Sequence, residues 1–144
     1  MFSKACQYGI KASVYVALQS SLGIRANLKE IAKNIDSPEA FTAKVLHQLA
    51  KNNLMDSHKG PTGGFVIDSA QAKNIRLSDI VKAIDGDRIY NGCALGFDKC
   101  DAEKPCPMHY HFVSIRNNLK NMLEQTSLFD LANELVKEPT FLKR

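Results

Sequence analysis

Residues 37–67 decide the fold of this chain, with the sequence SPEAFTAKVLHQLAKNNLMDSHKGPTGGFVI. Ser37 can cap a helix and Pro38 suits the first helical position, so a helix is predicted from there to about residue 51. Two short β-capable runs, 54–58 and 65–67, surround a glycine-rich turn and predict a hairpin. The expected buried face of the helix consists of Phe41, Val45, Leu46 and Leu49.

Two further helices precede this stretch. Apolar residues recur at spacings of three and four from Lys4 to about Ser21, which predicts an amphipathic helix that ends at Gly23. Asn27 and Glu30 are three residues apart, as in a capping box, and predict the start of a second helix. Three helices followed by a two-stranded hairpin is the element order of a winged helix-turn-helix.

The second half of the chain predicts a different organisation. Ser78 can cap a fourth helix that ends at Gly86, and residues 87–107 hold two prolines, two glycines and three cysteines without helical periodicity. A long helix follows, then a short one capped by Ser127, and Pro139 is expected to end the ordered part. The predicted fold is mainly α with a small β-hairpin: a winged helix-turn-helix (1–86), a cysteine-bearing loop (87–107), and a long C-terminal dimerisation helix with a short terminal helix (108–138).

Composition excludes several classes of protein. With 44% hydrophobic and 24% charged residues, the chain fits neither a disordered polyelectrolyte nor a membrane bundle, and no membrane partner is expected. We expect a cytoplasmic protein, in which four cysteines indicate metal binding, redox chemistry or burial rather than a disulfide framework. The sequence holds no nucleophile elbow, phosphate loop or HExxH motif, so an enzyme is not expected.

The charge is divided unequally along the chain. Residues 1–76 hold ten Lys/Arg and five Asp/Glu, a net +5, whereas residues 77–144 hold nine and ten, a net −1. A basic half with this element order predicts double-stranded DNA as the partner, because a helix fits the major groove and lysines contact phosphates. A winged-helix protein-interaction module is the alternative. The predicted DNA contacts are Ser37, Thr42, Lys44, His47, Gln48, Lys51, His58, Lys59, Thr62 and Gly63.

Three thiols and one imidazole lie within seventeen residues: Cys93, Cys100, Cys106 and His109. Thiolates and imidazoles bind both zinc and iron, and four such ligands are a usual complement. Zinc sites usually contain a close Cys-x2–4-Cys pair, which is absent here, but spacing alone leaves zinc and an iron–sulfur cluster both open. His111 and Cys6 are weaker candidates for the fourth ligand. A cofactor-free thiol switch is a further alternative.

Four segments carry a resemblance to a known family: KACQYGIKA (4–12), LKEIA (28–32), KGPTGGF (59–65) and LSDIVKAIDG (77–86). With them the chain resembles the Rrf2 family of small bacterial repressors over nearly its whole length. The resemblance implies a homodimer that binds a partly palindromic operator near promoters. From IscR-like and NsrR-like members it also implies an iron–sulfur cluster, [2Fe–2S] or [4Fe–4S], held by three cysteines in this region. The IscR-like pattern ends with a histidine three positions past the last cysteine, as His109 follows Cys106.

The sequence departs from the family pattern at three places. Lys59 stands where the family often has arginine, which keeps the charge but loses the planar fork. Ala43 stands where several members carry glutamate, so the operator sequence does not carry over. The first cysteine gap is one residue longer than is usual in the family, which leaves the cluster type open.

The long helix carries an apolar stripe with spacings of three and four. It can pack within the chain or against its copy in a second chain. We favour dimerisation, since two half-sites a helical turn apart are the usual route to operator specificity. The predicted dimer residues are Phe112, Ile115, Leu119, Met122 and Leu123.

Overall fold

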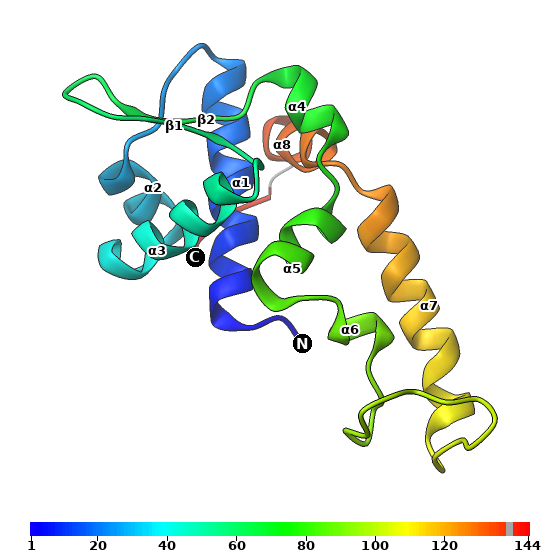
Figure 1. Ribbon diagram of the computed structural model, residues 1–144. Helices are drawn as coiled ribbons and strands as arrows, with labels where there is room; N and C mark the ends of the chain where they lie inside the picture. Colours follow the sequence, from blue (N-terminus) through cyan, green and yellow to red (C-terminus); the bar gives the residue numbers. More distant parts are fainter. Residues whose placement is uncertain (138–139) are drawn as a thin grey trace.

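The structure, a computed structural model, describes residues 1–137 and 140–144 (Figure 1). The expected end of order at Pro139 lies outside the described residues. Its elements in chain order are α1 (Lys4–Ser21), α2 (Leu28–Ile35), α3 (Glu39–Lys51), β1 (Asp56–His58), β2 (Gly64–Val66), α4 (Ser69–Asn74), α5 (Leu77–Asp85), α6 (Arg88–Asn91), α7 (His109–Gln125) and α8 (Leu128–Lys137). The predicted fold class, mainly α with one small antiparallel hairpin, is confirmed.

Several helix ends follow the local capping rules. The Asn27 side chain accepts the Glu30 N–H at 3.0 Å, and the Glu30 carboxylate accepts the Asn27 N–H at 3.4 Å, which completes the predicted capping box. Ser127 and Asp130 form the corresponding pair at the start of α8. Gly86 ends α5 with a φ of +75°, a conformation that side chains other than glycine rarely adopt.

The start of α3 differs from the prediction. The Pro38 carbonyl accepts the Thr42 N–H at 2.9 Å, so Pro38 is the N-cap and the helix begins at Glu39. Thr42 lies on the buried face with Val45, Leu46 and Leu49, whereas Phe41 is 36% exposed and its ring meets that of Tyr8 edge to face. The prediction that Phe41 belongs to the buried face was therefore wrong.

Short helices also differ from the expectation. α5 begins at Leu77, where the Asp79 carboxylate accepts the Arg76 N–H at 2.8 Å, rather than behind Ser78 as a cap. α4, which was not predicted, has its own capping box between Asp68 and Gln71. α6 is a single turn inside the segment expected to be a loop.

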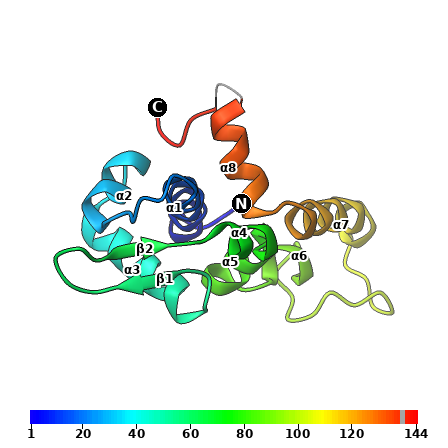
Figure 2. The ribbon, with the colours of Figure 1, turned by 90° about the horizontal axis from the view of Figure 1, so that it is seen from above.

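One core joins both ends of the chain. α1 packs against α2, α3, α5 and α8, and α8 also packs against α4 (Figure 2). The side chains of Leu123 and Leu128 are fully buried in this core. The Leu77 N–H donates to the Thr126 carbonyl at 3.0 Å, so the segment between α7 and α8 is tied to the start of α5. No described helix combines the length and the apolar character needed to cross a membrane.

The hairpin and the segment between α6 and α7 extend from opposite ends of the molecule, as both views show (Figures 1 and 2). α7 runs along one side and carries the second segment at its N-terminal end. Two separate regions therefore present the residues to which the sequence assigns chemistry.

Candidate nucleic-acid interface and cysteine centre

Strand β2 of the hairpin has backbone partners on both of its edges. β1 and β2 pair in the register Ser57↔Phe65, and β2 also bridges the segment after α1, where the Phe65 N–H donates to the Ala26 carbonyl at 2.8 Å. Gly64 has a φ of +148°, and a Cβ there would lie 2.6 Å from the Ala26 oxygen. Only glycine fits this close approach, so the backbone itself fixes the base of the hairpin.

Most of the predicted DNA contacts lie on two exposed surfaces. On α3 these are Lys44, His47, Gln48 and Lys51, and on the hairpin they are His58, Lys59 and Thr62, with Gly63 half-buried. The Gln48 side chain already donates from Nε2 to the Ala83 carbonyl at 2.8 Å, which ties α3 to the last turn of α5.

Thr42 is the predicted DNA contact that the structure contradicts. Its side chain is fully buried, and its hydroxyl donates to the Pro38 carbonyl at 2.8 Å and also contacts the Ser37 hydroxyl. Ser37 is half-buried and its hydroxyl contacts that of Thr42, and its contact with DNA stays a prediction. Thr42 can lie in the core because the Pro38 carbonyl, one turn before it, satisfies its hydroxyl.

Arg25 belongs to the hairpin surface and was not predicted. Its guanidinium donates to the Thr62 carbonyl at 3.1 Å, so an exposed cation from the α1–α2 connection lies against the turn that carries Lys59. No local motif marks Arg25, because its partner is 37 residues away in the sequence.

The four predicted metal ligands form two pairs. The sulfur of Cys93 lies 3.8 Å from that of Cys106, and the sulfur of Cys100 lies 3.2 Å from Nδ1 of His109. All three cysteines are half-buried, and His109 is buried. Within the described residues, no three or more His, Cys, Asp or Glu side chains gather closely enough to hold one metal ion.

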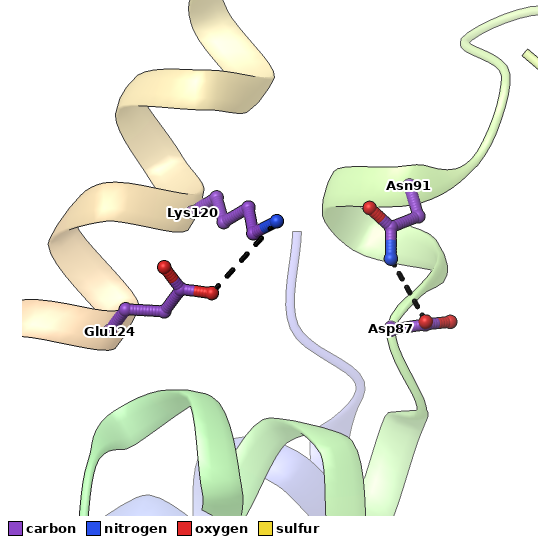
Figure 3. Close-up of polar contacts among 4 residues, drawn as sticks. All are labelled: Asp87, Asn91, Lys120 and Glu124. Carbon is purple, nitrogen blue, oxygen red and sulfur yellow. Dashed lines mark hydrogen bonds and ion pairs between the residues drawn. The ribbon is translucent and has the colours of Figure 1, made fainter.

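α7 holds both sides of this cysteine centre. Arg116 donates from Nη1 to the carbonyl of Gly92, the residue before Cys93, at 2.5 Å. At the other side, the His109 N–H donates to the Cys106 carbonyl at 2.9 Å. Two nearby side-chain contacts are local: Asn91 at the end of α6 donates to Asp87, the residue before α6, and Lys120 pairs with Glu124 within α7 (Figure 3).

A pocket of about 150 Å³ lies among the four residues. Lys99 and Lys104 also line it and bring positive charge to the thiols. The backbone N–H of Leu95, followed by that of Phe97 and the side chain of Cys106, lowers the pKa of the Cys93 thiol. The pocket thus brings two cations and one carboxylate, Asp101, to the cysteines, while hydrogen bonds favour the thiolate at Cys93.

The weaker candidates for a fourth ligand lie elsewhere. Cys6 is fully buried in the core, where burial and then the nearby Asp85 raise its pKa to about 12. A thiol in that environment stays protonated, and Cys6 does not line the pocket. His111 is exposed on α7.

The predicted dimer residues divide between the two faces of α7. Ile115 and Met122 are 57% and 45% exposed, and Phe112 and Leu119 are half-buried. Leu123 is fully buried in the core of its own chain, so its assignment to a dimer surface was wrong. The stripe splits because one face of α7 packs against α5 and α6 of the same chain.

A family model described as an iron-dependent transcriptional regulator, Rrf2, matches residues 2–134. The chain belongs to the Rrf2 family. An HTH-type transcriptional regulator of Aquifex aeolicus is 31% identical over 135 residues, 92% of each chain. IscR of Escherichia coli is 25% identical over 127 residues, 88% of this chain and 76% of its own length.

Solved structures of Rrf2 proteins agree with the fold. CymR, the global cysteine regulator of B. subtilis, superposes with a TM-score of 0.75 at 24% identity and covers 92% of this chain and 96% of its own. IscR of T. potens superposes with a TM-score of 0.71 at 19% identity and covers 94% and 88%. The protein is thus a transcriptional regulator of the helix-turn-helix type, and its relatives are regulators rather than enzymes.

Proposed function

We propose that this Rrf2 protein binds a partly palindromic operator as a homodimer, and that a [2Fe–2S] cluster on Cys93, Cys100, Cys106 and His109 modulates the binding. The observation that carries the proposal is the arrangement of these donors in two pairs beside one pocket. A [2Fe–2S] cluster takes two protein ligands on each of its two irons, so two pairs suit it better than one four-coordinate zinc ion.

The distance within the first pair fits ligation of one tetrahedral metal ion, whether iron or zinc. Two thiolates on one tetrahedral ion, each with a bond of about 2.3 Å, lie roughly 3.8 Å apart. The sulfurs of Cys93 and Cys106 have this separation, 3.8 Å. When bound, the cluster supplies an oxidisable, acid-labile centre whose loss releases all four side chains.

The DNA-binding surface consists of α3 and the hairpin. Lys44, His47 and Lys51 are exposed on α3, where they can reach base edges or phosphates of the major groove. Lys59 and Arg25 place two cations at the hairpin turn, which suits the sugar–phosphate backbone or a narrow minor groove.

The dimer surface consists of the outer face of α7. Ile115 and Met122 expose large apolar side chains there, and such a stripe is covered by its own copy in a symmetric dimer. Because α7 also holds Gly92 and Cys106, a change in the cysteine centre acts on the helix that sets the spacing of the two DNA-binding units.

Anaerobic reconstitution with iron and sulfide tests the cluster. We expect visible absorbance and about two irons and two sulfides per chain. His109→Ala is expected to lower the cluster content or shift its spectrum, whereas His111→Ala, its matched control, is not. Cys106→Ala is expected to abolish the signal and Cys6→Ala to preserve it. A wild-type protein without iron, or a cluster unchanged by Cys106→Ala, would contradict the proposal.

Genome-wide footprinting with the cluster-loaded and cluster-free forms tests the regulation. We expect some sites to be protected by one form only. Identical footprints of the two forms would contradict cluster control but not DNA binding. Light scattering on the same samples is expected to give the mass of a dimer, and Ile115→Asp is expected to give that of a monomer.

A further inference from the structure

The three thiols of the cysteine centre are not equivalent. Cys93 and Cys106 contact each other through their sulfurs at 3.8 Å, whereas the Cys100 sulfur contacts the His109 ring. Sulfurs at contact distance need to approach by less than 2 Å to reach the S–S bond length of about 2.05 Å. Cys100 is already engaged by another group, so one cysteine pair is selected out of the three conceivable ones.

Hydrogen bonds from α7 hold the backbone next to Cys93 and at Cys106. Arg116 fixes the carbonyl next to Cys93, and the His109 N–H fixes the carbonyl of Cys106 itself. Both donors belong to α7. Cys106 also stands between Pro105 and Pro107, whose rings restrict the backbone. The segments on either side of Cys100, residues 94–99 and 101–105, are exposed.

We propose that Cys93 and Cys106 form an intramolecular disulfide when the loop holds no cluster, while Cys100 stays a thiol. The inference rests on the proposed function, because it describes the cluster-free state of the same site. The disulfide and the cluster exclude each other, since the bond uses two of the sulfurs that would bind iron. The bond also protects both sulfurs from irreversible oxidation to sulfinic acid.

The oxidant is a hydroperoxide. The sulfur of one cysteine of the pair attacks the peroxide oxygen, the O–O bond breaks, and an alcohol (water from hydrogen peroxide) leaves a sulfenic acid behind. The sulfur of the second cysteine then attacks the sulfenic sulfur, and hydroxide leaves with the thiol proton as water. Two thiols lose two electrons to one peroxide, and a dithiol reverses the change by exchange.

Peptide mapping of the full-length chain tests the pairing. The protein is stripped of iron anaerobically, treated with one equivalent of hydrogen peroxide, blocked with iodoacetamide and digested without reduction. We expect one cross-linked peptide pair through Cys93 and Cys106, lighter by two hydrogens, and an alkylated Cys100. A bond that involves Cys100, a bond between chains, or the absence of a disulfide would overturn the inference.

Variants separate the pairing from general thiol reactivity. Cys100→Ala is expected to keep the disulfide, and Cys93→Ala to remove it. Arg116→Gln is expected to slow disulfide formation several-fold, because Gly92 loses its donor. Lys120→Gln is the matched control: it removes a cation from the same helix whose exposed partner is Glu124 at 4.0 Å, and it should leave the rate unchanged (Figure 3). Equal rates in Arg116→Gln and wild type would show that α7 does not hold the pair.

The peptide map tests the disulfide and the reconstitution tests the cluster, so either proposal can fail while the other holds. The map uses metal-free protein, so a disulfide in a chain that never takes up iron would overturn the cluster and support the inference. A chain that loads a cluster but forms no disulfide would support the cluster and overturn the inference. In cluster-loaded protein treated with peroxide, the disulfide is expected to appear only as the visible absorbance decays, and a disulfide in chains that retain full absorbance would contradict mutual exclusion.

Discussion

The hairpin turn and the cysteine loop are both exposed, glycine- and proline-containing segments, at opposite ends of the molecule, but they are held in different ways (Figure 2). Backbone hydrogen bonds hold the hairpin on two sides, through its own ladder and through Ala26. The cysteine loop is held by the guanidinium of Arg116, the backbone at His109 and contacts among its thiols. Backbone pairing holds the hairpin independently of side-chain chemistry, whereas one contact that holds the cysteine loop, between Cys93 and Cys106, depends on the state of the thiols.

The two regions also differ in the burial of their apolar side chains. The hairpin adjoins the core formed by α1, α2 and α3, where Leu46 and Leu49 are fully buried. Around the cysteine loop, Leu95 and Phe97 are more than half exposed. A surface that binds DNA needs a fixed conformation. A sensing segment needs a conformation that becomes ordered or disordered according to what it binds.

The largest expected effect separates the two regions by stability. Leu46→Ala removes a fully buried side chain and should lower the free energy of unfolding by about 2–5 kcal/mol. Cys100→Ala in the cluster-free protein should change it by about 0.5 kcal/mol or less, because the loop contributes little to the core. Urea denaturation of the two variants measures both values. A loss of similar size for Cys100→Ala would show that the loop is part of the folded core.

Substitution of one glycine in each region, Gly64 and Gly96, tests the comparison further. Gly64→Ala places a Cβ 2.6 Å from the Ala26 oxygen at a φ of +148°, and should cost about 1–3 kcal/mol and weaken operator binding. Gly96→Ala also stands at positive φ, +80°, but its Cβ meets nothing within 4 Å. The loop can relax around it, so we expect a smaller loss and unchanged DNA affinity. Thermal unfolding and DNA titration of both variants distinguish them, and equal effects would break the comparison.

Two lysines test which region contacts DNA. Lys59→Ala should weaken binding about equally for all operator sequences and reduce the slope of log K against log salt by about 1. Lys99→Ala removes the same charge from the cysteine loop and should leave the slope unchanged. Titrations at several salt concentrations give both slopes. A reduced slope for Lys99→Ala would place the cysteine loop on the DNA.

The smallest expected effect is local and changes no global stability. The Phe65 amide, which donates to Ala26 at 2.8 Å, should be protected from hydrogen exchange with or without a cluster. Amides of residues 94–99 should exchange rapidly in the cluster-free protein and gain protection when the cluster binds. Exchange measured by mass spectrometry on both forms checks this, and a loop already protected without the cluster would contradict it.

Local sequence signals predicted local structure well. The capping box of Asn27 and Glu30, the left-handed Gly86 and the hairpin around residues 59–64 depend on neighbours within a few residues. The prediction failed at the edge of a helix face. Phe41 was assigned to the buried face for its apolar ring, but Thr42 lies one turn before Val45 and Leu46, and its hydroxyl is satisfied by the Pro38 carbonyl, so Thr42 is buried and Phe41 is exposed.

The candidate sites show the same limit. The spacing of Cys93, Cys100, Cys106 and His109 identified a group of donors, but which of them pair follows from their positions on the loop and α7. Arg25 and Arg116 carry no motif, since their partners, Thr62 and Gly92, are distant along the chain.

The sequence by itself determined the order of the elements and the division into a basic half and a cysteine-bearing half. It also determined the family resemblance, which the match of the Rrf2 family model to residues 2–134 confirms. These features depend on residue types and on short spacings along the chain. Only the tertiary structure decided that Leu123 belongs to the core and that α7 holds both sides of the cysteine centre. Each depends on segments that are distant in the chain and meet only when the apolar faces of α1, α5 and α8 are buried together, which no local pattern encodes.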